Sequence, residues 1–115
     1  MRPLTLSATG WVLMSAHPDK EVDRLIRRAN IATRRTEDRQ PMDLMMQRVR
    51  EARVSGTAYA ENLPLFGGAT LCVRLPMTVQ GRPVVLGMGG ALERIRPRRD
   101  EYLQLMQDLV ATLRA

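Results

Sequence analysis

Aromatic and thiol side chains are scarce in this 115-residue sequence. Aromatic residues make up 3% of it and are Trp11, Tyr59, Phe66 and Tyr102. Cys72 is the only cysteine, so no disulfide can form within the chain, and we expect a reducing compartment, the cytoplasm. Apolar residues still make up 44%. The core must therefore be aliphatic, with eight methionines filling its irregular gaps.

Long apolar runs are also absent. No stretch approaches the roughly 20 residues of a membrane-spanning helix. The apolar N-terminal stretch is interrupted by Thr5, Ser7, Thr9 and Gly10, which is unlike a secretory signal. We expect no contact with a membrane. The length corresponds to one domain at most, which we expect to span residues 1–115.

Lysine is nearly missing, since Lys20 is the only one among 18 basic residues, and the formal net charge is +6. A nucleic-acid surface gathers its basic residues on one element and often adds aromatic rings. Here the arginines are spread along the chain, and no aromatic residue is interleaved with the arginine pairs. We expect no direct nucleic-acid contact by this segment; a GC-rich genome explains the arginine bias equally well.

The first half of the chain predicts three helices. A short one covers residues 7–16, with Ser7 or Thr9 as its cap. The second follows Pro18 and ends near Asn30, and its buried stripe is Val22, Leu25, Ile26 and Ala29. Residues 31–40 are polar and predict a loop. The third starts at Pro41 and stops at Gly56, and its inner face is Met42, Met45, Val49 and Ala52.

The second half predicts strands and a closing helix. Short strands are expected at Thr57–Ala60, Thr70–Pro76 and Val84–Gly90, with a loop over 61–69. The sequence VQGRP joins the last two strands and is typical of a hairpin. A basic loop leads to Pro97. The last helix is expected over Arg98–Arg114, with Leu103, Met106, Val110 and Leu113 on one face.

This order predicts an α+β fold with an antiparallel sheet flanked by helices, because strands joined by a tight turn run antiparallel. Two or three strands make a sheet that is marginal alone. We therefore expect that further strands are missing from the segment or are supplied by a second copy of the chain.

Catalytic chemistry has little support. His17 is the only histidine and Cys72 the only thiol, whereas nucleophilic catalysis needs a nucleophile, a base and an orienting group. His17 beside Pro18 is an ordinary helix-start residue, and Cys72 lies in an apolar strand. One histidine and one cysteine give no metal-ligand spacing. We expect no enzyme activity, no metal and no cofactor.

Two glycine-containing segments are candidates for ligand contact. Gly87, Gly89 and Gly90 lie in a predicted strand, and no Gly-Lys-Ser/Thr sequence of a phosphate loop follows them. Glycine in a strand marks a bulge or a close approach to the backbone, either by a packed helix or by a small ligand. The segment Ser7–Gly10 leaves amides at a helix start, where a carboxylate can bind.

Several runs taken in order resemble the effector-binding domains of IclR-family transcriptional regulators. They are LTLSATGWVLMSAHPDKEVDRLI, MDLMMQRVREARVSGTAYAEN, GGATLCVRLPMTVQGRPVVLGMGGALERI and EYLQLMQDLVATLRA. The resemblance covers nearly the whole chain. It implies a GAF-like fold that lacks the N-terminal part of the domain, and a separate DNA-binding domain that is absent here. It also implies a small organic acid as effector and a homo-oligomer, dimer or tetramer.

The resemblance also implies ligand-binding residues: Ala8, Thr9, Gly10, Cys72, Gly87 and Gly89. The amides of Ala8, Thr9 and Gly10 would meet the carboxylate of the effector. Gly87 and Gly89 stand where many family members have serines, so contact there must come from backbone. The first hypothesis is therefore a ligand sensor of a transcription regulator. The alternative is a truncated oligomerisation or partner domain that binds no ligand.

Overall fold

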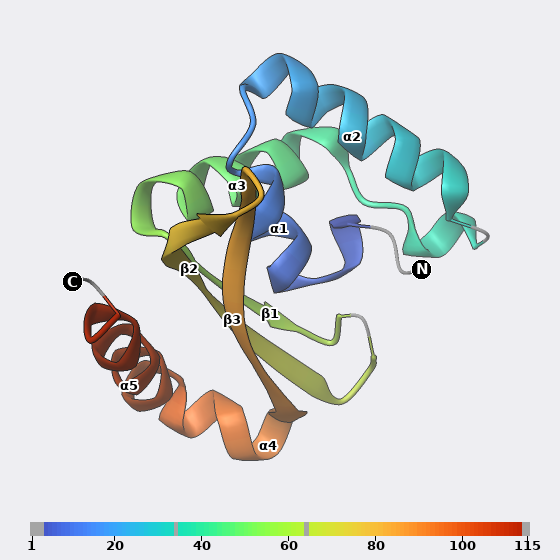
Figure 1. The fold of residues 1–115 in the computed structure, drawn as a ribbon. Helices are drawn as coiled ribbons and strands as arrows, with labels where there is room; N and C mark the ends of the chain where they lie inside the picture. Colours follow the sequence, from blue (N-terminus) through green and yellow to red (C-terminus); the bar gives the residue numbers. More distant parts are fainter. Residues whose placement is uncertain (1–3, 34, 64, 114–115) are drawn as a thin grey trace.

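The structure is a computed structural model that describes residues 4–33, 35–63 and 65–113. Helices come first, then a three-stranded sheet, then helices again (Figure 1). The first group is η1 (Leu4–Leu6), α1 (Ala8–Met14), α2 (Asp19–Ala32), η2 (Thr36–Asp38) and α3 (Met42–Ser55). The strands are β1 (Thr57–Glu61), β2 (Gly68–Val79) and β3 (Arg82–Ala91). The last group is α4 (Leu92–Ile95), η3 (Arg96–Arg98) and α5 (Arg99–Ala111).

Capping residues set the helix ends much as expected. Ser7 accepts a hydrogen bond from the amide of Gly10 at 3.0 Å and caps α1. Asp19 and Glu21 lie in the first turn of α2, where the helix dipole favours negative charge. Gly56 ends α3 at φ 73°, and its amide donates to the carbonyl of Ala52. The predicted starts of α2 and α3 and the predicted stop of α3 are confirmed.

The sheet is antiparallel throughout, with the strands in the order β1-β2-β3. The longest strand, β2, lies in the centre, so β1 and β3 are its edges (Figure 1). Gln80 and Gly81 both have positive φ in the tight turn between β2 and β3, as a two-residue hairpin requires. The α+β prediction and the hairpin are confirmed.

Two buried clusters cover the two faces of this sheet. Side chains alternate along β2, so Cys72 packs with α1, α2 and α3, while Leu71 and Val73 pack with α5. In Figure 1, α1, α2 and α3 gather on one side of the sheet, and α4 and α5 on the other. Leu71 and Cys72 are both fully buried. The strand β2 therefore belongs to both halves of the core.

The core positions predicted from helix periodicity are largely buried. Val22, Ile26 and Ala29 are buried in α2, and Met45, Val49 and Ala52 in α3; Leu25 and Met42 are partly buried. In α5 the buried residues are Met106 and Val110. Leu113 is 48% exposed because α5 ends at Ala111. The prediction that Leu113 continues the inner face was wrong.

Other boundaries also differ from the prediction. The helix α2 runs two residues past Asn30, and the Thr33 hydroxyl then donates to the carbonyl of Ala29. The expected loop over 31–40 contains the 3-10 turn η2. The expected basic loop before Pro97 is instead α4 and η3, which Ile95 anchors by its burial. The hairpin strands extend beyond the predicted ends to Gly68 and Val79 and to Arg82 and Ala91.

Candidate functional site

Two glycines of β3, Gly87 and Gly89, share one face of the sheet with two residues of β2. Cys72 pairs with Gly87 and Thr70 pairs with Gly89. Because residues two apart in a strand point to the same face, all four lie on the face that α1 covers. Cys72 belongs to the cluster that contains Ala8 and Val12 of α1.

Thr9 connects the start of α1 to this face. A Cβ built on Gly87 would lie 3.6 Å from the Thr9 hydroxyl oxygen, so the strand approaches the helix closely there. The Thr9 hydroxyl also lies close enough to the Cys72 thiol to lower the pKa of that thiol. The structure therefore brings together three of the predicted site residues: Thr9, Cys72 and Gly87.

Burial keeps Cys72 in its neutral form. It is fully buried, and this burial raises the pKa of its thiol to about 11, although the nearby Thr9 hydroxyl partly opposes the shift. A neutral thiol is a weak nucleophile. His17 is exposed, at the other end of α1. Among the described residues, no group of three or more histidine, cysteine or acidic side chains is placed to hold a metal ion.

The amides at the start of α1 are not equivalent. That of Gly10 donates to Ser7, and both Ala8 and Gly10 are buried. Within the described part of the chain, no hydrogen bond from the amides of Ala8 and Thr9 is seen. An anion at this helix start would therefore meet Ala8 and Thr9, while Gly10 serves the cap.

Gly89 lines a pocket of about 300 Å³. Its other lining residues are Leu63, Leu65, Gly68, Ala69, Thr70 and Gly90. The lining includes none of Ala8, Thr9 or Gly10. The pocket is mostly apolar, with a floor of backbone where Gly89 and Gly90 carry no side chain. Gly89 is two residues beyond Gly87 on the same face of β3. It lines this pocket, whereas Thr9, Cys72 and Gly87 do not.

Thr70 is the polar side chain of this pocket, and sequence reasoning missed it. Its hydroxyl oxygen is buried and has no hydrogen-bond partner among the described residues. A buried hydroxyl without a partner costs roughly 1–3 kcal/mol, so a ligand atom that bonds to it recovers that free energy. Its signal in the sequence was its place two residues before Cys72, on the same face of the strand.

No family model matches the chain, and no curated protein sequence matches it. Solved structures do match. The effector domain of the transcriptional regulator IclR from Acinetobacter sp. ADP1 is 50% identical, with a TM-score of 0.93, over 98% of this chain and 66% of that one. The chain belongs to the IclR family. It matches part of that effector domain, 66% of its length.

Two further solved structures of transcription regulators share the fold at lower identity. The inducer-binding domain of PobR from Acinetobacter, a double mutant in complex with 3-hydroxybenzoic acid, is 20% identical with a TM-score of 0.79, over 98% of this chain and 68% of that one. IclR of Thermotoga maritima is 16% identical with a TM-score of 0.72, over 91% of this chain and 43% of that one. This chain therefore spans between 43% and 68% of these three proteins.

The matched proteins are transcriptional regulators, which agrees with the prediction that the chain is not an enzyme. None of the described helices is long and apolar enough to cross a membrane. The predicted relation to IclR effector domains is confirmed.

Proposed function

We propose that this chain is the ligand-sensing and oligomerising part of an IclR-type transcription regulator, and that its effector is a small organic acid. The observation that carries the proposal is the 50% identity to an effector domain over 98% of the chain. The bound 3-hydroxybenzoic acid of the PobR inducer-binding domain supports the class of ligand.

The proposed site comprises Ala8, Thr9, Gly10, Cys72, Gly87 and Gly89, with Thr70 added. Contact among Thr9, Cys72 and Gly87 supports it, as does the pocket that Gly89 lines. The apolar body of the acid would lie on the backbone of Gly89 and Gly90. The unpartnered hydroxyl of Thr70 would bond to a polar atom of the ligand, and the amides of Ala8 and Thr9 would attract its carboxylate.

Thermal unfolding in the presence of small organic acids tests this function. A ligand selective for the folded state raises the melting temperature as its concentration rises above Kd. We expect 3-hydroxybenzoic acid or another small aromatic or aliphatic acid to raise it at millimolar concentration. No shift with any acid of such a panel contradicts the sensing function.

The Thr70→Val variant tests whether the ligand that raises the melting temperature binds beside Thr70. Valine keeps the shape and removes the hydroxyl, so we expect the fold to persist and the ligand-induced shift to fall. The matched control is Thr78→Val, because Thr78 is an exposed residue on the hairpin arm. A shift that Thr70→Val leaves unchanged would place the ligand elsewhere.

The assembly and location belong to the same proposal. Residues 1–115 would form one domain, the C-terminal portion of the effector-binding domain, which associates as a dimer or tetramer in the cytoplasm. A separate domain would contact DNA, and effector binding would act by favouring one arrangement of the subunits. Light scattering coupled to size-exclusion chromatography measures the mass, and a monomer at all concentrations contradicts oligomerisation.

A second candidate function is oligomerisation without a ligand. It is favoured by the separation of Gly89 from the start of α1 and by the free edges of a three-stranded sheet. An oligomer whose melting temperature responds to no acid is the outcome expected of this candidate alone.

A further inference from the structure

The edge strand β1 carries backbone groups that face away from the sheet. The Arg74 amide donates to the Gly56 carbonyl, and the Asn62 amide donates to the Gly68 carbonyl, just beyond the two ends of β1. Hydrogen-bonded pairs alternate along an antiparallel ladder. The even-numbered residues of β1 therefore bond to β2, and the backbone of Thr57, Tyr59 and Glu61 faces outward.

Ser55 closes one end of this free edge. Its hydroxyl accepts from the Thr57 amide and lies 3.1 Å from the Thr57 carbonyl oxygen. In the described part of the chain, no hydrogen bond to the N–H or C=O of Tyr59 or Glu61 is seen. Two residues of β1 thus offer donors and acceptors at the spacing of a strand.

Two hollows of about 260 and 400 Å³ lie along this edge, between α3 and α5. Both are lined by Trp11, Arg48, Tyr59 and Arg99, so they form one groove, which we call the β1 groove. Together they extend over Ala58, Tyr59, Ala60 and Glu61. Space for an added chain therefore coincides with the unused backbone groups.

Two arginines border the β1 groove from opposite faces of the sheet. Arg48 comes from α3, on the side of α1, whereas Arg99 comes from α5 and lies 5.2 Å from the centre of the Tyr59 ring. Their ion pairs are local and loose, at 3.6 Å to Glu51 and 3.3 Å to Asp100. Both guanidinium groups thus keep capacity for another carboxylate.

Glu61, the carboxylate of β1, does not pair with Arg48 or Arg99. Arg96 donates twice to Glu61, at 2.8 Å to each oxygen, and the Tyr59 hydroxyl also donates to it. Arg96 therefore balances the charge of Glu61. The carboxylates that remain close to the bordering arginines are Glu51 and Asp100, which are 55% and 89% exposed.

We propose that the β1 groove binds an extended acidic segment of a partner protein, which adds to β1 as a further strand. Backbone hydrogen bonds to Tyr59 and Glu61 would set its register, as in other strand additions. Consecutive residues of a strand point to opposite faces. Two adjacent acidic residues would therefore reach Arg48 on one face and Arg99 on the other.

Fluorescence anisotropy with a labelled hexapeptide, Thr-Val-Glu-Asp-Val-Thr, tests the proposal. We expect saturable binding that weakens as salt is added, since exposed charge pairs are screened. A peptide with Gln-Asn in place of Glu-Asp should bind at least about fivefold more weakly, because it loses its charge pairs with the arginines. The variants Arg48→Glu and Arg99→Glu should weaken binding of the acidic peptide by a similar factor, because each also adds a repulsive charge. Arg24→Glu is the matched control: Arg24 is an exposed helical arginine paired with Glu21 on α2, and binding should not change.

Two more arms separate strand addition from simple charge attraction. A peptide N-methylated at alternate residues on its pairing edge keeps its charges but loses its amide donors, and it should not bind. A Lys-Lys peptide should bind the double variant Arg48→Glu, Arg99→Glu better than it binds the original chain. Equal binding of the methylated peptide, or no binding of any acidic peptide, overturns the proposal. It is also overturned if the double variant alters the oligomeric mass, because the groove then holds a second copy of the chain.

Discussion

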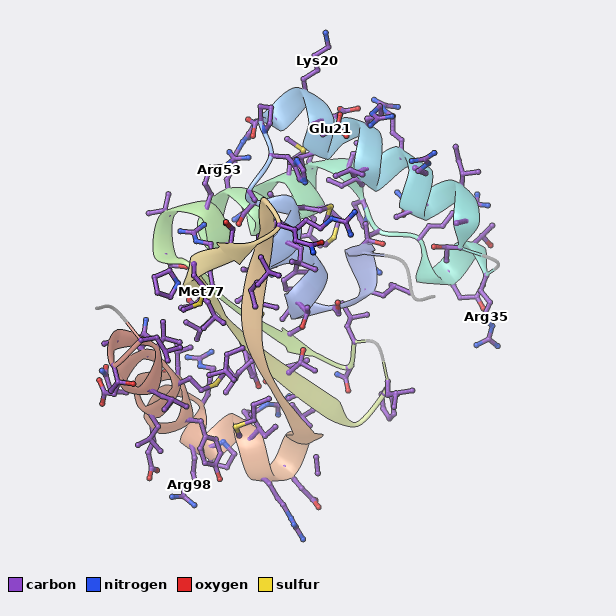
Figure 2. The ribbon with its side chains drawn as sticks, in the orientation of Figure 1. Lys20, Glu21, Arg35, Arg53, Met77 and Arg98 are labelled. Carbon is purple, nitrogen blue, oxygen red and sulfur yellow. The ribbon has the colours of Figure 1, made fainter. Side chains whose placement is uncertain are left out.

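Arg53 joins three elements through one guanidinium group. Arg53 lies on α3, as Figure 2 shows. It donates to the carbonyl of His17 at 2.7 Å, to the carbonyl of Ser15 at 3.2 Å and to Asp19 at 2.8 Å. The two carbonyls belong to the end of α1 and the turn after it, and Asp19 opens α2. Arg53 therefore links α3 to the end of α1 and to the start of α2.

The Arg53→Ala variant should lower the free energy of unfolding by about 1 kcal/mol or more, because two carbonyls lose a charged donor. Urea denaturation followed by circular dichroism measures this loss. Arg50→Ala is the control, since Arg50 is more exposed and, among the described residues, is seen to bond to Asp19 alone. Its effect should be a few tenths of a kcal/mol. Equal effects of the two variants would mean that the carbonyl bonds contribute nothing.

Glu61 makes the stability of the fold depend on pH. Its bonds from Arg96 and Tyr59 lower the pKa of its carboxyl from 4.5 to about 2. The stability that a lowered carboxyl pKa contributes is present above pH 4.5 and is lost as the pH falls toward about 2. We expect the melting temperature of the original chain to fall more steeply between these values than that of Glu61→Gln. The variant keeps part of the decline, because the pKa of Asp19 is also lowered, by Arg53 and Arg50.

At the scale of elements, a left-handed residue ends α3. Gly56 has φ 73°, a conformation that costs a residue with a Cβ roughly 1–2 kcal/mol. Gly56→Ala should therefore lower the free energy of unfolding by about 1 kcal/mol, measured by urea titration. Gly87→Ala is the control, because its added Cβ would lie at an ordinary 3.6 Å from Thr9 and its φ is not positive. The idea fails if Gly87→Ala costs as much as Gly56→Ala.

Local signals predicted the elements well where one residue decides the outcome. The sequence indicated that helices start after Pro18 and Pro41, that α3 stops at Gly56 and that the chain turns at Gly81. The structure contains all four features. Other boundaries were missed. The helix α4 forms where Ile95 packs against the sheet, and β2 extends past Pro76 to Val79 because it still pairs with β3 there. The site was predicted in part, since the glycines were visible as a pattern. The unsatisfied hydroxyl of Thr70 exists only through burial by residues distant in sequence.

At the scale of the whole molecule, β2 connects the two buried clusters. The cluster around α1, α2 and α3 contains Trp11, the only tryptophan, which is 4% exposed. The cluster around α5 contains Met106 and Val110. They meet at the sheet, where adjacent residues of β2, Leu71 and Cys72, enter opposite clusters. We therefore expect the two clusters to unfold together, as small single domains usually do.

Met106→Ala tests that coupling, because Met106 is buried on the α5 side alone. A truncation of this size costs about 2–5 kcal/mol when buried. If β2 couples the cores, Trp11 fluorescence and far-ultraviolet circular dichroism should shift to lower urea concentration by the same amount, although Trp11 lies on the opposite face. Leu105→Ala is the control, since Leu105 is 58% exposed on the same helix and both signals should barely move. A Trp11 transition that stays in place while the circular dichroism transition shifts would show that α5 unfolds separately, and the sheet would then not act as the common core of the fold.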